Sequence, residues 1–280
     1  MTVNTALTES LTQTTRRAGE LLREMQRGPL QVDEKGRSDL VTDADRAAES
    51  LVRARLEERW PGARLILEEG GTTRAPGTGH ERLCFIIDPL DGTTNFAATL
   101  PHFAVAIGVE EEGRGLVAGC VYDPFRDEMF VAERGHGAWL NDRRLHVSAT
   151  DRLRDSVLAT GFAYDRYTNP DDNHAEFAAV NLSCRGVRRF GAATLDLAWV
   201  AAGRLDGFWE RGLRPWDLAP GVVLIEEAGG KLSRYDGRPA ALDVPDVVAS
   251  NGHLHQELCD AVVRARAAAG RSPCPADTPS

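Results

Sequence analysis

The strongest constraint on the fold is a short apolar run at residues 83–87 that leads directly into two acids on a turn. Five consecutive apolar residues have the length of a buried strand. Pro89 has no N–H and cannot extend a ladder, so the strand is expected to end at Asp88. Asp88 and Asp91 then lie three residues apart, where like charges repel unless a cation lies between them. Because carboxylate oxygens suit Mg²⁺, this turn is a candidate metal site.

The residues that follow these acids have the properties of an anion site. Gly92 lets the backbone approach a ligand closely. The backbone N–H groups of Gly92 and Thr93 face a ligand if a helix starts here, and the hydroxyls of Thr93 and Thr94 add donors. Acids for a metal beside donors for an anion predict a metal-bound phosphate ester. An Asp-Gly pair after a strand is also typical of a plain turn, and that alternative stays open at this point.

Length and charge narrow the class of protein. The 280 residues suit one large domain or two intimately packed ones. Hydrophobic residues make up 42% and charged residues 27%, as in an ordinary soluble protein. A net charge of −9 argues against nucleic acid as the main ligand, because such a partner requires a basic surface. No apolar run approaches the length of a membrane span and no signal peptide is evident, so no membrane is expected.

The cysteines indicate the redox compartment. There are five, an odd number, and none form a C-x-x-C pair. This pattern favours a reducing, cytoplasmic location without disulfides or a thiolate zinc site. Cys84 and Cys120 lie in apolar runs and are expected to be small core residues.

Apolar periodicity predicts helices and strands along the whole chain. Helices are expected at residues 5–27, 43–60, 173–180, 192–201, 222–228 and 254–269. Strands are expected at residues 65–67, 83–87, 156–161, 187–190, 207–210 and 247–250, with an antiparallel meander over 103–140. The glycine-rich residues 70–79 are expected to form a loop, and residues 35–39 a polar hairpin tip or mobile flap.

The organisation into parts follows from a polar stretch near residue 150. Residues 1–150 are expected to form an N-terminal metal- and phosphate-binding α+β part, and residues 151–270 a C-terminal α/β part. Residues 271–280 are rich in Pro and Ser and are expected to be a disordered tail.

Further acids lie at helix starts and strand ends. Thr42 has the sequence context of a helix N-cap, with Asp45 in the capping-box position. Glu68 and Glu69 follow a strand, where adjacent acids are usually solvated, and Asp217 lies where an N-cap would. Each acid has a structural explanation by itself. Together they fall at positions where open α/β sheets collect their ligands.

Four motifs in this order resemble those of the inositol monophosphatase family of Mg²⁺-dependent, lithium-sensitive phosphatases. They are LVTDAD at residues 40–45, the pair Glu68-Glu69, DPLDGTTNF at 88–96 and WDLAPG at 216–221. The resemblance covers about residues 5–265. It implies an α/β (α+β) fold, a layered αβαβα sandwich of the sugar-phosphatase type with two intimately packed subdomains, usually assembled as a homodimer.

The resemblance also implies how metal and water are held. The ligands of two or three Mg²⁺ ions would be Glu68, Asp88, the Leu90 carbonyl, Asp91 and Asp217. Asp45 and Thr93 resemble the pair that activates the attacking water. Glu69 would lie behind the ligands, and Lys35 would belong to a flap within residues 28–40 that helps to order a metal.

The ester itself would be bound by backbone and side-chain groups from several segments. The implied substrate contacts are Asp91, Gly92, Thr93, Gly191, Ala192, Ala193, Thr194, Glu210 and Asp217. Glu210 matches the position whose acid contacts an inositol hydroxyl. GFAYD at residues 161–165 is similar to a GFPYD stretch common in inositol phosphatases, with Ala163 in place of Pro. We therefore expect a small-molecule phosphate ester, inositol 1-phosphate, with histidinol phosphate, fructose 1,6-bisphosphate and 3′-phosphoadenosine phosphates as alternatives.

Two other classes of function compete with a phosphatase. A glycosidase could use Asp88 and Asp91 as its acid pair. It would need no metal, and it leaves Glu68, Thr93 and Asp217 without roles. An interaction scaffold could retain the fold without activity, but every ligand position of the motifs is filled.

Overall fold

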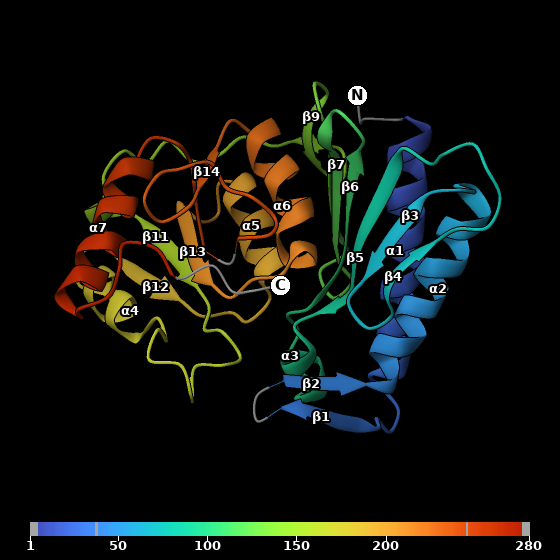
Figure 1. Ribbon diagram of the computed structural model, residues 1–280, viewed down its shortest axis with the longest axis horizontal. Coiled ribbons are helices and arrows are strands. Elements are labelled where there is room, and N and C mark those ends of the chain that lie inside the picture. Colours follow the sequence, from blue (N-terminus) through green and yellow to red (C-terminus); the bar gives the residue numbers. More distant parts are fainter. Residues whose placement is uncertain (1–4, 37–38, 245, 276–280) are drawn as a thin grey trace.

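The computed structural model describes residues 5–36, 39–244 and 246–275. It does not describe the side chains of residues 35–39. The described residues form two sheets, a separate short hairpin, and helices between and outside the sheets (Figure 1). The hairpin pairs β1 (Val32–Gly36) with β2 (Asp39–Thr42), as expected for the polar segment around residue 36.

The larger sheet has the strand order β10-β9-β8-β7-β6-β5-β3-β4. Its strands are β3 (Arg64–Leu67), β4 (Gly71–Arg74), β5 (Leu83–Asp91), β6 (Ala104–Glu111), β7 (Gly115–Asp123), β8 (Glu128–Glu133), β9 (Gly137–Leu140) and β10 (Arg143–Arg144). Strands β3 and β5 are parallel. Strands β6 to β9 form the antiparallel meander predicted over residues 103–140, and β5 extends it by pairing antiparallel with β6. The loop expected over residues 70–79 is partly wrong, because β4 pairs there with β3.

The smaller sheet has the strand order β12-β11-β13-β15-β14. Its strands are β11 (Val157–Thr160), β12 (Gly186–Arg188), β13 (Gly207–Arg211), β14 (Lys231–Ser233) and β15 (Asp246–Ser250). Strand β11 is parallel to both of its neighbours. Strand β14 was not expected from the sequence, because three residues are too few to show a period.

The helices complete five layers. They are α1 (Ala6–Met25), α2 (Asp43–Arg59), α3 (Thr93–Ala97), α4 (His174–Asn181), α5 (Ala193–Ala201), α6 (Pro215–Glu227) and α7 (His255–Ala268), with a 3-10 turn at Leu153–Asp155. Helices α1 and α2 cover one face of the larger sheet, α5 and α6 lie between the sheets, and α4 and α7 cover the far side of the smaller sheet (Figure 1). This confirms the αβαβα layering. None of the described helices has the length and apolar content that crossing a membrane requires.

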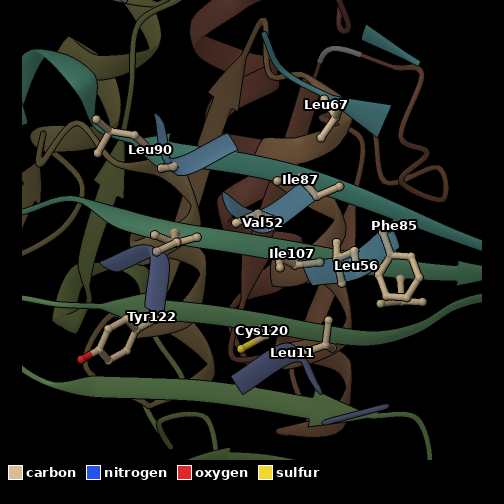
Figure 2. Close-up of a cluster of buried hydrophobic side chains, with 14 of the residues drawn as sticks. Leu11, Val52, Leu56, Leu67, Phe85, Ile87, Leu90, Ile107, Cys120 and Tyr122 are labelled. Atoms are coloured by element: carbon tan, nitrogen blue, oxygen red, sulfur yellow. The ribbon is translucent and has the colours of Figure 1, made fainter. Parts of the chain in front are cut away.

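Apolar clusters hold these layers together. Figure 2 shows side chains from α1 and α2, among them Leu11 and Val52, packed on Ile87, Ile107 and other residues of the larger sheet. A second cluster fills the space between the two sheets around α5 and α6, and a third lies between the smaller sheet and α7. Burial of this apolar surface is the main term that stabilises the fold.

Strand β5 is longer than the sequence predicted. The ladder with β6 continues past Asp88, which pairs with Ala106, to Asp91, which pairs with Ala104. The register shifts between the two acids, at the position of Pro89. Proline is tolerated at such an irregularity because no ladder hydrogen bond is needed there. The expected end at Asp88 was therefore wrong, and both acids belong to the strand.

Helix α6 begins earlier than predicted. The expected start was residue 222 with Asp217 as the N-cap, but the helix begins at Pro215 and its N-cap is Arg214. Pro220 lies inside the helix and cannot donate a hydrogen bond to the preceding turn. That proline is why the sequence favoured a later start.

Close packing on the larger sheet positions α6. A Cβ added to Gly119 of β7 would lie 2.8 Å from the Cα of Pro220, which is shorter than any ordinary contact. Only glycine at this position lets the helix lie so close to the strand. The first turn of α6, which carries Asp217, is thereby fixed relative to β5 and β6.

The C-terminal segment is ordered further than expected. Arg271 donates a hydrogen bond of 3.0 Å to Glu176, and Cys274 is buried in the third cluster. The expectation of disorder is therefore wrong for residues 271–275, and residues 276–280 lie outside the described residues. Cys84 and Cys120 are buried and unpaired, as predicted for core residues.

Candidate active site

A cavity of about 370 Å³ brings together most of the residues that the sequence singled out. The predicted residues that line it are Glu68, Asp88, Leu90, Asp91, Gly92, Thr93, Gly191, Ala192, Ala193, Glu210 and Asp217. Asp45 and Thr194 are not among the lining residues but hydrogen-bond to Thr93 and Asp91, respectively, which are. The side chain of Lys35 lies outside the described groups.

Parallel pairing of β3 and β5 places the first two acids side by side. Leu67 pairs with Ile87, so Glu68, which directly follows β3, lies beside Asp88 within β5. The pKa of Asp88 is raised well above its usual value, first by burial and then by the negative charges of Glu68, Asp91 and Asp217. The four carboxyl groups therefore lie close enough to repel one another.

Asp91 is held from the far side of the cavity by the start of α5. Its Oδ2 accepts hydrogen bonds from the Thr194 N–H at 2.7 Å and the Thr194 hydroxyl at 2.5 Å. Burial raises the pKa of Asp91, and these donors act against that rise. The orientation of the carboxylate is thus set by a residue 103 positions away in the chain.

Asp217 occupies the third position of α6 and closes a capping box. Its Oδ2 accepts the Arg214 N–H at 2.7 Å, and the residue also lines the cavity. Burial raises the pKa of Asp217 to about 7, and the charge of Asp91 adds to the rise. The Asp217 side chain therefore both caps α6 and belongs to the cluster of acids that line the cavity.

The cavity-lining Thr93 and the buried Asp45 form a hydrogen-bonded pair. The Thr93 hydroxyl donates to Asp45 Oδ1 at 3.0 Å and lies 3.1 Å from the Leu90 carbonyl oxygen. Asp45 Oδ2 accepts the Thr42 N–H at 2.8 Å and the Thr42 hydroxyl at 2.6 Å, which confirms the predicted capping box of α2. The pKa of Asp45 is raised, chiefly by burial.

Leu90 and Glu69 support this pair from two sides. The Leu90 side chain is anchored in the core (Figure 2), so its carbonyl oxygen is held beside the Thr93 hydroxyl. The Glu69 N–H donates to Glu49 Oε2 at 2.8 Å, and the negative charge of Glu69 contributes to the raised pKa of Asp45.

Glu210 lies at the opposite wall, on the smaller sheet. Strands β11 and β13 are parallel and pair Thr160 with Trp209, so Gly161 lies directly beside Glu210. A Cβ added to Gly161 would overlap the Glu210 carboxylate. Burial raises the pKa of Glu210 to about 8, the positive charge of Arg189 opposes the rise, and the charges of Asp217 and Asp91 add to it.

Sequence reasoning missed several lining residues. Arg189 and Asp196 flank the predicted segment 191–194, and Trp216 lines the cavity while also packing on a small apolar cluster. Asp196 gave one usable signal, since it is a lone acid within the apolar helix ATLDLAWVA. Arg189 gave none, because a basic pair such as Arg188-Arg189 at the end of a strand is ordinary.

The donor set fits a divalent cation. The four acids supply hard oxygen ligands. Burial and then the repulsion between these acids raise the pKa of Asp88, and a bound cation would relieve the repulsion. Within the described part of the chain no three His, Cys, Asp or Glu side chains already converge as a metal-binding group. Mg²⁺ usually takes one or two carboxylates and keeps several waters, so acids distributed around a cavity suit it.

Comparison with known proteins identifies the family. The model described as "Inositol monophosphatase family" matches residues 4–267. The chain belongs to this family. An inositol-1-monophosphatase from Synechocystis sp. is 47% identical over 233 residues, which cover 83% of this chain and 80% of that relative. The Nus factor SuhB of Escherichia coli K12 is 41% identical over 259 residues, which cover 89% of this chain and 96% of SuhB.

A solved structure agrees with the family assignment. The inositol monophosphatase from Anabaena superimposes with a TM-score of 0.82 at 40% identity, covering 92% of this chain and 95% of that one. As an inositol monophosphatase family protein, this chain is a phosphoric monoester hydrolase. Enzymes of the family depend on Mg²⁺.

Proposed function

We propose that this inositol monophosphatase family protein hydrolyses inositol 1-phosphate by direct attack of water, without a covalent phosphoenzyme. The carrying observation is that Glu210 faces the same cavity as the four clustered acids. A phosphate held at the acids therefore leaves its alcohol beside a carboxyl group that can accept hydrogen bonds from hydroxyls. The names of the relatives, which include inositol-1-monophosphatase, support this choice of alcohol.

We propose the predicted ligands as the metal site. Two or three Mg²⁺ ions would be held by the side chains of Glu68, Asp88, Asp91 and Asp217 and by the Leu90 carbonyl. When bound, Mg²⁺ neutralises phosphate charge and polarises the ester. Uncatalysed hydrolysis of phosphate monoesters is among the slowest reactions known, so the protein has to supply this charge and positioning.

The chain's own residues provide a route for the proton. A water next to Thr93 can give a proton to its hydroxyl oxygen while the hydroxyl passes its proton to Asp45 Oδ1, 3.0 Å away. Burial raises the pKa of Asp45, which makes it a stronger base than an exposed aspartate. The Thr42 donors keep Asp45 in the required orientation.

The start of α3 is proposed to bind the phosphoryl group. Gly92 is its N-cap and has a φ of 90°, which favours glycine. The first N–H groups of a helix have no partner within it, so those of Gly92 and Thr93 are available to phosphate oxygens. The segment Gly191 to Thr194, Asp91 and Glu210 would contact the hydroxyls of the alcohol.

The organisation of the protein is proposed along the same lines. The larger sheet lies within residues 1–150 and the smaller within 151–270, which supports a division into two packed parts. We also propose a homodimer. Light scattering after gel filtration would report about twice the 30.5 kDa chain mass for a dimer, and a single chain mass would contradict it.

A panel of esters tests the proposed function. Phosphate release is measured with Mg²⁺ from inositol 1-phosphate, histidinol phosphate, fructose 1,6-bisphosphate and 3′-phosphoadenosine 5′-phosphate, with and without lithium. Inositol 1-phosphate should show the highest kcat/KM, and lithium should inhibit its hydrolysis. A higher kcat/KM for another ester would replace the proposed substrate.

The same assay separates the rival classes. EDTA should abolish turnover, whereas a glycosidase using Asp88 and Asp91 would cleave a glycoside in its presence. Absence of phosphate release from every ester would favour a scaffold. That outcome has some support in the name of the SuhB relative, a Nus factor.

A further inference from the structure

Asp196 is a buried acid without a hydrogen-bond partner for its Oδ1 among the described residues. It is 1% exposed and lines the same cavity as the predicted site. A buried polar group that forms no hydrogen bond destabilises a fold, so such groups are rare and call for an explanation. Strained or unsatisfied groups that persist are expected at functional sites.

A second acid with the same burial shows the contrast. Asp246 is also 1% exposed, but its Oδ2 accepts the Tyr235 N–H at 2.9 Å and its Oδ1 pairs with Arg234 at 3.2 Å. Asp246 therefore has the partners that a structural buried acid requires. Among the described residues, Oδ1 of Asp196 has no such hydrogen-bond partner, so Asp196 differs from a structural buried acid.

The position of Asp196 in the cavity is at the proposed alcohol end. It lies on α5 two residues after Thr194, whose donors hold Asp91. Burial raises the pKa of Asp196 well above its usual value, the negative charges of Glu210 and Asp91 add to the rise, and the positive charge of Arg189 opposes it. Two carboxyl groups, Asp196 and Glu210, thus line one cavity close enough for their charges to interact.

We propose that Asp196 is a further specificity-determining residue, whose carboxyl group hydrogen-bonds a hydroxyl of the substrate's alcohol beside the one bound by Glu210. Two neighbouring carboxyl groups match two neighbouring hydroxyls, as in a cyclic polyol, because each hydroxyl can donate to one of them. The positive charge of Arg189 acts on both acids, which favours a neutral polyol over an ammonium group. The inference rests on the proposed function and deepens it by assigning a second carboxyl group, that of Asp196, to the proposed alcohol site.

The test compares two ligands that differ only in hydroxyls. Asp196→Ala and Asp196→Asn are assayed with Mg²⁺ for hydrolysis of inositol 1-phosphate and for inhibition of that reaction by cyclohexyl phosphate. Loss of one hydrogen bond to a hydroxyl should raise KM for inositol 1-phosphate about tenfold in Asp196→Ala. The inhibition constant of cyclohexyl phosphate should change less than about twofold, because that ring has no hydroxyl to lose.

Thermal unfolding distinguishes a role in binding from a structural role, because loss of a structural acid would lower the Tm. The Tm of Asp196→Ala should equal or exceed that of the wild type, since an unsatisfied buried group is removed. The matched variant Asp246→Ala should have a lower Tm, because it leaves the Tyr235 N–H and the Arg234 guanidinium without their hydrogen-bond acceptor. A fall in Tm for Asp196→Ala as large as that for Asp246→Ala would overturn the inference.

The outcomes also separate this inference from the proposed function. Suppose that the wild type hydrolyses inositol 1-phosphate. If the KM of the Asp196 variants is then unchanged, or if KM and the inhibition constant of cyclohexyl phosphate rise together, only the proposed role of Asp196 is contradicted. If the wild type neither hydrolyses inositol 1-phosphate nor binds it in titration calorimetry with Mg²⁺, the proposed substrate falls, and the polyol specificity of Asp196 falls with it.

Discussion

The Thr93 hydroxyl and the Asp45 carboxylate, 48 positions apart in the chain, are joined by a hydrogen bond of 3.0 Å. Asp45 is 1% exposed and its other oxygen is fully engaged by Thr42, so only Oδ1 remains to receive a proton from the cavity. Thr93 lines the cavity and Asp45 does not. The pair therefore connects a buried base to a solvent-facing hydroxyl.

Removing the Thr93 hydroxyl should break this connection. We expect Thr93→Ala to lower kcat for inositol 1-phosphate by about 10²–10⁴, the usual contribution of a positioned acid or base, with little change in KM. Thr93→Ser keeps the hydroxyl and should retain most of the activity. Steady-state kinetics measure both parameters, and a loss confined to KM would contradict a role in water activation.

Asp91→Asn should abolish turnover without unfolding the protein. The amide oxygen can still accept the Thr194 donors, but the negative charge proposed to hold the metal is lost. Removing one of several repelling acids should leave the Tm unchanged or raise it. Phosphate release and thermal unfolding are measured on the same sample. Activity near that of the wild type would exclude Asp91 from the site.

Gly161→Ala should disturb the Glu210 wall of the cavity. The new Cβ would overlap the Glu210 carboxylate, so the side chain has to move away from its position. We expect KM for inositol 1-phosphate to rise by about tenfold or more, equivalent to the loss of one good hydrogen bond. Gly28→Ala is the control, because its Cβ would meet only an ordinary contact of 3.5 Å. Equal kinetics for both variants would show that Glu210 is not needed for binding.

His255 predicts how stability depends on pH. Its ring nitrogens bond to the Ser233 hydroxyl at 2.8 Å and the Ser250 hydroxyl at 2.9 Å, and burial, followed by the charge of Lys231, lowers its pKa to about 4. The unfolded chain has the ordinary value of about 6.5, so it binds more protons between pH 6.5 and 4. The contribution to stability is thus complete above pH 6.5 and is lost as the pH falls toward 4, by up to about 3 kcal/mol.

Urea unfolding at pH 7.5 and 4.5 measures this dependence. The wild type should lose more stability between the two pH values than His255→Gln, which has no ring to protonate. His136→Gln is the control, because it makes the same substitution at an exposed histidine. Other buried groups, including His102 with a pKa of about 4, contribute equally to all three proteins. The same slope for the wild type and His255→Gln would contradict the assignment.

A buried ion cluster should make Arg266 important for stability. Arg266 is 1% exposed and contacts Glu176 at 2.8 Å and Asp171 at 2.7 Å. Arg266→Met removes the buried partner that Glu176 and Asp171 share, although Arg271 still contacts Glu176 at 3.0 Å. Breaking a buried pair typically costs about 3–5 kcal/mol. Arg114→Met removes an exposed pair with Glu111 and should cost less than about 1 kcal/mol. Equal losses in chemical denaturation would show that the buried cluster adds nothing.

Much of the local structure was predictable, because its causes lie within a few residues. The cap formed by Thr42 and Asp45 follows from their three-residue spacing, and the meander over residues 103–140 follows from alternating runs and turns. The errors have local causes too. Pro220 concealed the start of α6, and the irregularity at Pro89 concealed the continuation of β5.

The sequence by itself determined which chemical groups are present and the short motifs that carry them, because caps, turns and acid pairs depend on neighbouring residues. Only the tertiary structure decided which of these groups meet. The parallel register of β3 and β5 brings Glu68 beside Asp88, and that of β11 and β13 brings Gly161 beside Glu210. The sequence around Asp196 gave no signal of function beyond its charge. That its Oδ1 has no hydrogen-bond partner among the described residues depends on how the interior packs.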